Sequence, residues 1–264
     1  MAKYEIVDDV GIIPKGVTGD IEVILGGGTY AENITFNEKD SGLGHYRVIY
    51  KNKEGEKPVV YGGTIVSGWE KYDDKVYKTH LGIDEFHLMT ENGELSTKAR
   101  FPNTDYAFVT QNSDNPKISF HYGKELGMPH IENKSNLEVY FWGGGGIAWD
   151  ANTRTVTKMD EGTRYIEYEK AGSYDMIKNS RFYVRGALEF LDIPGEFYYD
   201  KAAGDLYYYP RNLPIEEQEI AVPSQHNIVE FFGESKDEPV RNIKLEGIEL
   251  NTADRLFRGI HMNC

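Results

Sequence analysis

Short runs in which apolar and polar residues alternate recur along the whole chain. Such alternation is typical of β-strands with one buried face. Glycine, proline, asparagine and aspartate separate the runs, as turns require. No apolar stripe with helical period extends beyond two turns, and one polar turn over 214–219 is the best helix candidate. We therefore predict an all-β chain with strands at 21–25, 46–50, 59–61, 137–141, 155–157, 164–168, 205–209, 228–232 and 242–245.

The spacing of the strands divides the chain into three parts. The runs at 23–25 and 48–50 lie 25 residues apart, an interval that suits the coils of a solenoid, although antiparallel sandwiches also space strands closely. Similar runs return after residue 222, whereas the middle has all three tryptophans, longer loops and hairpin-like elements. We predict first coils at 1–66, an inserted antiparallel β-sandwich-like domain at 67–222, and resumed, truncated coils at 223–264.

A hairpin is predicted over 194–210. Pro194-Gly195 supplies one tight turn, and Gly204 supplies a left-handed position in a second turn between two tyrosine-rich runs. Alternation then divides the side chains between two faces, with Phe197, Tyr199, Leu206 and Tyr208 on one and Tyr198 and Tyr207 on the other.

Composition excludes several classes of function. A net charge of −14 is unsuited to nucleic acid or to an anionic membrane surface. No stretch of 18 apolar residues occurs, and the first residues lack the apolar core of a signal peptide. The seven histidines have no metal-ligand spacing, no nucleotide-binding motif is present, and Cys264 is the only cysteine. We therefore expect no cofactor and no metal. The aromatic content of 13% favours strands and is compatible with a sugar-stacking surface.

Four segments resemble one group of proteins. Val23-Ile-Leu-Gly-Gly-Gly-Thr-Tyr30 is similar to the opening coil of right-handed parallel β-helix proteins, and the segment 54–69 resembles their next coil. Lys98-Ala-Arg-Phe-Pro-Asn103 resembles an Ala-Arg-Tyr-Pro-Asn motif, and 180–210 resembles Leu-Asp-x-Pro-Gly-Glu-Trp-Tyr followed by Gly-x-Leu-Tyr-Tyr-x-Pro. The group includes glycoside hydrolase families 120 and 141. The chain departs from it at 91–96, at 184–187 and in the family's usual start, which is missing.

The resemblance implies an incomplete right-handed parallel β-helix interrupted by a β-sandwich-like insertion. It implies a bacterial glycoside hydrolase acting on plant or algal polysaccharide, and an extracellular or periplasmic location. Glycoside hydrolysis generally uses two carboxylates. In the resembling families these lie on coils after the point where this chain stops, so the chain is expected to be the amino-terminal portion of the enzyme.

Candidate site residues come from the last coil and from two loops. Asp254 is a weak catalytic candidate and is otherwise a solvated turn residue. Arg100 can fork onto hydroxyls or a carboxylate, or form a structural salt bridge. Trp142 precedes four glycines and is either a sugar platform or a core residue at a hairpin tip. The substrate-binding candidates are Arg100, Asn103, Trp142, Arg255 and His261.

Two other functions remain open: a non-catalytic sugar-binding or adhesion module on the same scaffold, and a polysaccharide lyase. The partner in each case is a poly- or oligosaccharide. Because no cap follows Asn251, the last coil would expose unpaired strand edges. We therefore expect self-association through the carboxy-terminal coil.

Overall fold

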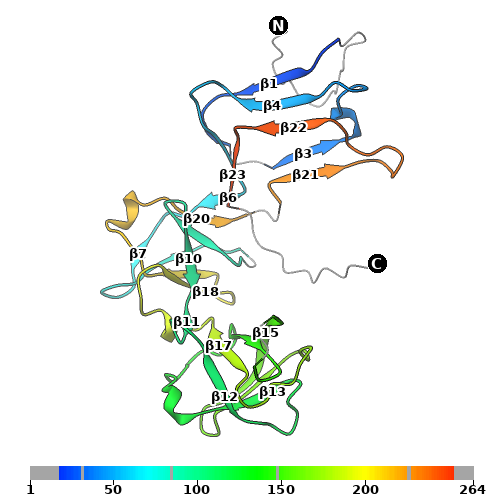
Figure 1. Ribbon diagram of the computed structural model, residues 1–264. Coiled ribbons are helices and arrows are strands. Elements are labelled where there is room, and N and C mark those ends of the chain that lie inside the picture. Colours follow the sequence, from blue (N-terminus) through cyan, green and yellow to red (C-terminus); the bar gives the residue numbers. More distant parts are fainter. Residues whose placement is uncertain (1–17, 31–32, 84–85, 147–148, 225–226, 253–264) are drawn as a thin grey trace. The chain divides into compact units, whose positions relative to one another are not determined.

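The computed structural model describes residues 18–30, 33–83, 86–146, 149–224 and 227–252 (Figure 1). The all-β prediction is confirmed, with a strand at each of the predicted runs. The described helical elements are short 3₁₀ turns: η1 (Glu38–Asp40), η2 (Lys124–Leu126), η3 (Leu188–Phe190) and η4 (Ile215–Glu217). The chain forms two compact units. Unit 1 comprises the described residues up to Ile65 and from Ala221 onward, and unit 2 is Val66–Ile220.

Unit 1 is built mainly from parallel pairs of short strands, and the arrows of β1, β4 and β22 point the same way in Figure 1. The first sheet has the order β1 (Ile21–Leu25), β4 (Val48–Asn52), β22 (Ile243–Glu246). The second has the order β2 (Gly28–Tyr30), β5 (Pro58–Tyr61), β23 (Glu249–Asn251), and a third pairs β21 (Val229–Phe232) with β3 (Ile34–Asn37). An antiparallel pair joins β6 (Gly63–Ile65) to β20 (Ile220–Pro223).

The register of the first sheet differs from the sequence spacing by two residues. Ile21 lies opposite Val48, 27 positions later, and Val23 lies opposite Tyr50 rather than Val48. Side chains on a strand alternate with period two, so a shift of two residues leaves every side chain on its original face. The apolar pattern therefore located the strands without determining their register.

The core of unit 1 lies between its parallel sheets. Phe36, Val48 and Val60 are buried, and the Phe36 ring lies 5.1 Å from that of Tyr50 and 5.2 Å from that of Phe231, centroid to centroid. These contacts join side chains from β3, β4 and β21, so segments far apart in sequence share one core.

Unit 2 contains a run of six neighbouring strands of one sheet, which is antiparallel except where β10 runs parallel to β18. Its order is β9 (Met89–Glu91), β10 (Glu94–Lys98), β18 (Glu196–Asp200), β19 (Asp205–Tyr208), β8 (Tyr77–His80), β7 (Glu70–Lys71). The predicted hairpin is confirmed as β18–β19, with Gly204 at φ +72°. Tyr198 is as buried as Phe197, so this hairpin is covered on both faces.

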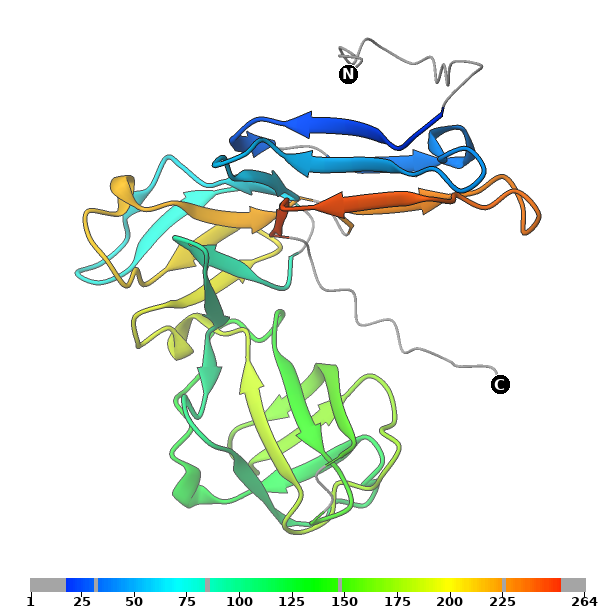
Figure 2. The same cartoon turned by 45° about the horizontal axis from the view of Figure 1, so that its top comes forward.

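The remaining strands of unit 2 form an antiparallel sheet that closes on itself (Figure 2). Its order is β11 (Arg100–Phe101), β17 (Arg181–Arg185), β12 (Ala107–Gln111), β13 (Ser119–Tyr122), β16 (Tyr165–Tyr168), β15 (Ala151–Asp160), β14 (Glu138–Trp142). The sequence analysis predicted an antiparallel β-sandwich-like domain. Here β17 also pairs with β14, which closes the sheet around a core that includes Phe120, Phe141, Ile166 and Phe182.

Candidate functional site

The outer surface of β14 and β17 has an unusual set of side chains. Both strands alternate between buried residues and partly exposed ones. Val139, Phe141, Phe182 and Val184 point into the closed core and are fully buried. Because neighbouring residues of a strand face opposite sides, the intervening residues form an outer face. Their cross-strand pairs are Glu138 with Arg185, Tyr140 with Tyr183, and Trp142 with Arg181.

Aromatic rings on this face contact one another in series. The rings of Tyr140 and Tyr183 stack with centroids 5.0 Å apart and an interplanar angle of 5°. Trp142 tilts against Tyr140 at 4.8 Å, and Tyr106 meets Trp142 edge-on at 4.8 Å. Phe108 of β12 lies opposite Arg181 and is 52% exposed. We call Tyr106, Phe108, Tyr140, Trp142 and Tyr183, together with Arg181, the aromatic face.

Arg181 lies at the centre of one row of the aromatic face. Its cross-strand neighbours are Phe108 on one side and Trp142 on the other. Its guanidinium carbon is 4.9 Å from the Trp142 ring centroid and 5.0 Å from that of Tyr106, within cation–π range. Sequence reasoning did not select this residue. Its position in the 180–210 block, on a strand with polar residues at alternate positions, was the available signal.

Arg100, which the sequence analysis predicted as a substrate contact, lies on the same surface opposite Arg185 of β17. Its guanidinium carbon lies 3.7 Å from the Tyr183 ring centroid. Nε donates to the Pro102 carbonyl at 2.9 Å and Nη2 donates to the Asp105 carbonyl at 2.6 Å. Arg100 therefore ties the loop between β11 and β12 to the Tyr183 ring. Its donors serve backbone carbonyls of this loop, so the observed contacts are structural.

Glu138 lies at the end of β14 that is farther from Trp142, and it pairs with two basic side chains. Its Oε2 lies 2.9 Å from Lys98 Nζ and 2.7 Å from Arg185 Nε. Burial alone would raise the pKa of Glu138, but the two cations outweigh it and hold the pKa below its ordinary value. Lys98 and Arg185 are thus paired, and the guanidinium of Arg100 donates to two carbonyls. Among the described residues, Arg181 is left as the cation of this surface with neither an acidic partner nor a hydrogen-bond acceptor.

Trp142 lies on the aromatic face and the glycines after it turn the chain away. A Cβ at Gly143 would lie 2.7 Å from the Tyr174 carbonyl oxygen, so only glycine fits there. Gly144 donates its N–H to the Asp175 carbonyl and Gly145 donates to Ser180 Oγ. The glycine run therefore packs against the segment 174–180 of its own chain.

Asn103 is partly buried and belongs to a polar cluster with exposed Asp192 and buried Glu196. Its Nδ2 donates to Asp192 Oδ1 at 2.6 Å, and the Asp192 N–H donates to Glu196 Oε2 at 3.3 Å. Glu196 is 1% exposed, and burial raises its pKa to about 7. Neither Glu196 Oε1 nor Asn103 Oδ1 has a hydrogen-bond partner within the part of the chain that the structure describes. The predicted contact Asn103 is thus directed into the protein.

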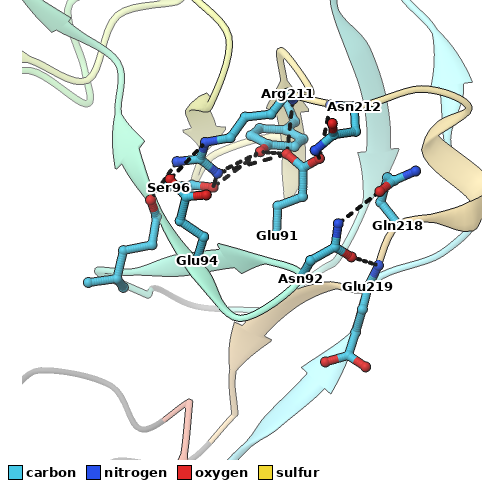
Figure 3. Close-up of polar contacts among 10 residues, drawn as sticks. Glu91, Asn92, Glu94, Ser96, Arg211, Asn212, Gln218 and Glu219 are labelled. Carbon is cyan, nitrogen blue, oxygen red and sulfur yellow. Dashed lines mark hydrogen bonds and ion pairs between the residues drawn. The ribbon is translucent and has the colours of Figure 1, made fainter.

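Glu91 is the centre of a second buried cluster, shown in Figure 3. Its Oε2 accepts hydrogen bonds from Tyr208 Oη and from the Arg211 N–H, and Oε1 accepts from Asn212 N and Nδ2 at 3.0 and 3.1 Å. Arg211 in turn donates to the Leu95 carbonyl at 2.5 Å. Because both carboxylate oxygens are occupied, Glu91 clamps the segment after β19 onto the β9–β10 hairpin rather than offering a free acid.

A shallow polar recess lies over β7, β8 and β19, and Lys78, His80 and Asp205 line part of it. Asp205 is bonded to Lys78 Nζ at 2.6 Å and to His80 Nδ1 at 3.0 Å. The hydrogen bond from Lys78, followed by that from His80, lowers the pKa of Asp205. Lys78, His80 and Asp205 are therefore paired with one another.

The other predicted site residues, Asp254, Arg255 and His261, lie outside the described residues. Within the described ranges, no group of three or more His, Cys, Asp or Glu side chains is placed to hold a metal ion. Nor does that part of the chain contain a helix with the length and apolar character needed to cross a membrane.

Comparison with known proteins shows what these elements are similar to. Residues 159–211 match the GH141 insertion domain. This segment contains β17 and the β18–β19 hairpin, and it includes the whole 180–210 block, on which the resemblance mainly rested. The match supports a likeness to family 141 in particular. A comparison with curated proteins gives no match.

A solved structure described as "Glycoside hydrolase" has the same fold, with a TM-score of 0.76 and 21% identity over 89% of this chain. This chain spans 44% of the length of that protein. A second structure, "The complex structure of XylC with xylose", matches at a TM-score of 0.34 and 14% identity, over 88% of this chain and 30% of that one. That value is too low to support an argument. The fold is therefore glycoside hydrolase-like.

Proposed function

We propose that this chain is part of a carbohydrate-active enzyme of the glycoside hydrolase type, acting on a plant or algal polysaccharide. The observation that supports this most directly is the likeness in fold to a glycoside hydrolase across 89% of the chain. The match of residues 159–211 to the GH141 insertion domain supports it independently, because that comparison uses sequence alone.

In this proposal, unit 1 forms the first coils of a right-handed parallel β-helix and unit 2 is an insertion between them. Two parallel pairs in unit 1, β1 with β4 and β2 with β5, support this, because parallel neighbours separated by about one coil of chain are the repeating unit of a solenoid. The parallel pair of β3 and β21 joins strands on either side of unit 2 in the sequence. The division at residues 65 and 221 supports the insertion, since both ends of unit 2 join unit 1 there.

Hydrolysis itself is assigned to two carboxylates on later coils. Two of the buried acids of unit 2 support this assignment because their carboxylates are engaged otherwise. Glu91 accepts hydrogen bonds at both oxygens, and Glu138 is held by Lys98 and Arg185. General acid–base chemistry needs an acid that can reach a glycosidic oxygen. This chain supplies scaffold and binding surface in the proposed enzyme.

A non-catalytic saccharide-binding module is the second candidate, and the aromatic face favours it. Aromatic rings at a solvent-exposed surface offer apolar area for a pyranose ring. Such a surface serves binding whether or not catalytic coils are attached.

The test uses a panel of aryl glycosides that includes xylosides, fucosides and galactosides. It is run on this chain and on any longer natural polypeptide that contains it. We expect turnover by a longer polypeptide, and none by this chain despite a folded β-type circular dichroism spectrum. Turnover by this chain that disappears in Asp254→Asn would overturn the assignment of catalysis to later coils. Saccharide binding without turnover in every form would favour the binding module.

A further inference from the structure

Arg181 differs from the other arginines of its surface in its partners. The guanidinium of Arg100 donates to two backbone carbonyls, and that of Arg185 pairs with Glu138. Arg181 has ring contacts with Trp142 and Tyr106, and within the described ranges it has neither a hydrogen-bond acceptor nor an acidic partner. A guanidinium presents five N–H donors in a planar fork that matches a carboxylate. These donors are therefore available to a ligand.

The rings around Arg181 define what kind of ligand fits. Trp142 and Phe108 flank it in the same cross-strand row, and the stacked pair Tyr140 and Tyr183 continues the surface along β14 and β17. The face of an aromatic ring is electron-rich and attracts the polarised C–H groups of a sugar ring. A row of rings along two strands suits several consecutive sugar units.

Charge indicates that the ligand is acidic. The chain as a whole has a net charge of −14, so its surface repels anions in general. The unpaired cation at the centre of the aromatic face is a local exception. A neutral sugar would leave the charge of Arg181 without a counterpart, whereas a carboxylate forms a charge-assisted, bidentate pair with it.

We propose that the aromatic face binds an acidic oligosaccharide, with Arg181 holding a uronate carboxylate and Trp142 and Phe108 stacking on sugar rings. This inference rests on the proposed function, because it assumes a carbohydrate ligand. It goes further by naming the binding surface, the charge of the sugar and the residue that selects for it. Hydrolytic chemistry is not required at this surface.

The test measures binding of a uronic acid oligomer and of the same oligomer after chemical reduction of its carboxyl groups. Isothermal titration calorimetry on the whole chain gives both affinities. We expect the acidic oligomer to bind more tightly, and Arg181→Gln to weaken it by about tenfold or more while leaving the reduced oligomer nearly unchanged. Trp142→Ala should weaken both, because stacking does not depend on the carboxylate.

Arg47→Gln is the matched control. Arg47 is exposed in unit 1, and its substitution removes the same charge from a residue that is not part of the aromatic face. Arg181→Lys keeps the charge but not the fork, and should bind the acidic oligomer with intermediate affinity. Thermal unfolding of each variant shows whether it is folded. Since the side chain of Arg181 forms no hydrogen bond with the described residues, we expect no large change in melting temperature.

Three results would overturn the inference. Equal affinity for the two oligomers would exclude selection by charge. Unchanged acidic binding in Arg181→Gln would place the ligand elsewhere. Absence of saccharide binding, with concentration-dependent dimerisation that Phe108→Ser abolishes, would make the aromatic face an interface between two copies. None of these results bears on turnover in the glycoside panel, so failure here is distinguishable from failure of the proposed function.

Discussion

The guanidinium of Arg100 stacks on the ring of Tyr183, with 3.7 Å between the guanidinium carbon and the ring centroid. Arg100 lies on β11 and Tyr183 on β17, so the contact links two strands whose register is set by Arg100 opposite Arg185. Two backbone carbonyls of the following loop accept hydrogen bonds from the same guanidinium. One side chain thus supports both the loop that presents Tyr106 and one end of the aromatic face.

Arg100→Ala should destabilise unit 2 by about 1–2 kcal/mol, because it removes a cation–π contact and two hydrogen bonds to carbonyls. Urea unfolding followed by tryptophan fluorescence measures this. Arg100→Lys keeps the charge but cannot reach both carbonyls, and should recover only part of the loss. Equal stability of Arg100→Ala and the unsubstituted chain would contradict the structural role.

Glu91→Gln should cost about 2–4 kcal/mol, because an amide nitrogen cannot accept the hydrogen bonds that the lost oxygen accepted. The free energy of unfolding from urea titration is the measurement. Glu94→Gln is a control within the same cluster, since Glu94 is 74% exposed and lies 3.7 Å from Arg211 Nε. That variant should unfold much like the unsubstituted chain. Similar losses in both variants would contradict the clamp.

Glu196 should make the protein less stable as the pH rises. Burial raises its pKa from 4.5 to about 7 in the folded state. Between these values the unfolded chain releases the proton and the folded chain retains it, so stability falls as pH rises through this window, by at most about 3 kcal/mol. Glu196→Gln should lose this dependence and be the more stable form at pH above about 7. Urea titrations at several pH values compare the two.

Glu161 provides a comparison of opposite sign. Hydrogen bonds from Lys134 and His130 lower its pKa to about 2. Its contribution to stability is therefore present above its ordinary pKa of 4.5 and is lost as pH falls toward 2. Glu161→Gln should reduce stability near neutral pH but not in strong acid. Glu196→Gln should not reduce stability near neutral pH. Parallel pH profiles for the two variants would contradict the assignment of Glu196.

Self-association through the carboxy-terminal coil stays a prediction. Among the described strands, β22 and β23 each pair with one neighbour, so one edge of each has no strand partner there. Leu250 on β23 is 46% exposed. Unpaired strand edges with apolar side chains favour pairing between chains. Light scattering over a concentration series should show growing apparent mass, and a constant monomer mass at high concentration would contradict this.

The alternation of apolar and polar residues determined the fold class and most strand positions. The hairpin of β18 and β19 was predictable because its turn at Gly204 and its period-two pattern are local in sequence. The register between the parallel strands of unit 1 was not predictable, because shifts of two residues preserve the buried face. Val23 therefore lies opposite Tyr50 rather than the residue that its spacing suggested.

Candidate binding residues were predictable by type, and their surroundings were not. Trp142 was selected from the sequence, but its place on an outer face follows from the pairing of β14 with β17. Asn103 and Arg100 were also selected, yet tertiary contacts direct their donors toward Asp192 and two carbonyls. Arg181 was not selected, because its lack of a partner emerges only when distant strands meet. The local pattern determines which face of a strand a residue occupies. The pairing of distant strands determines which side chains it contacts on that face.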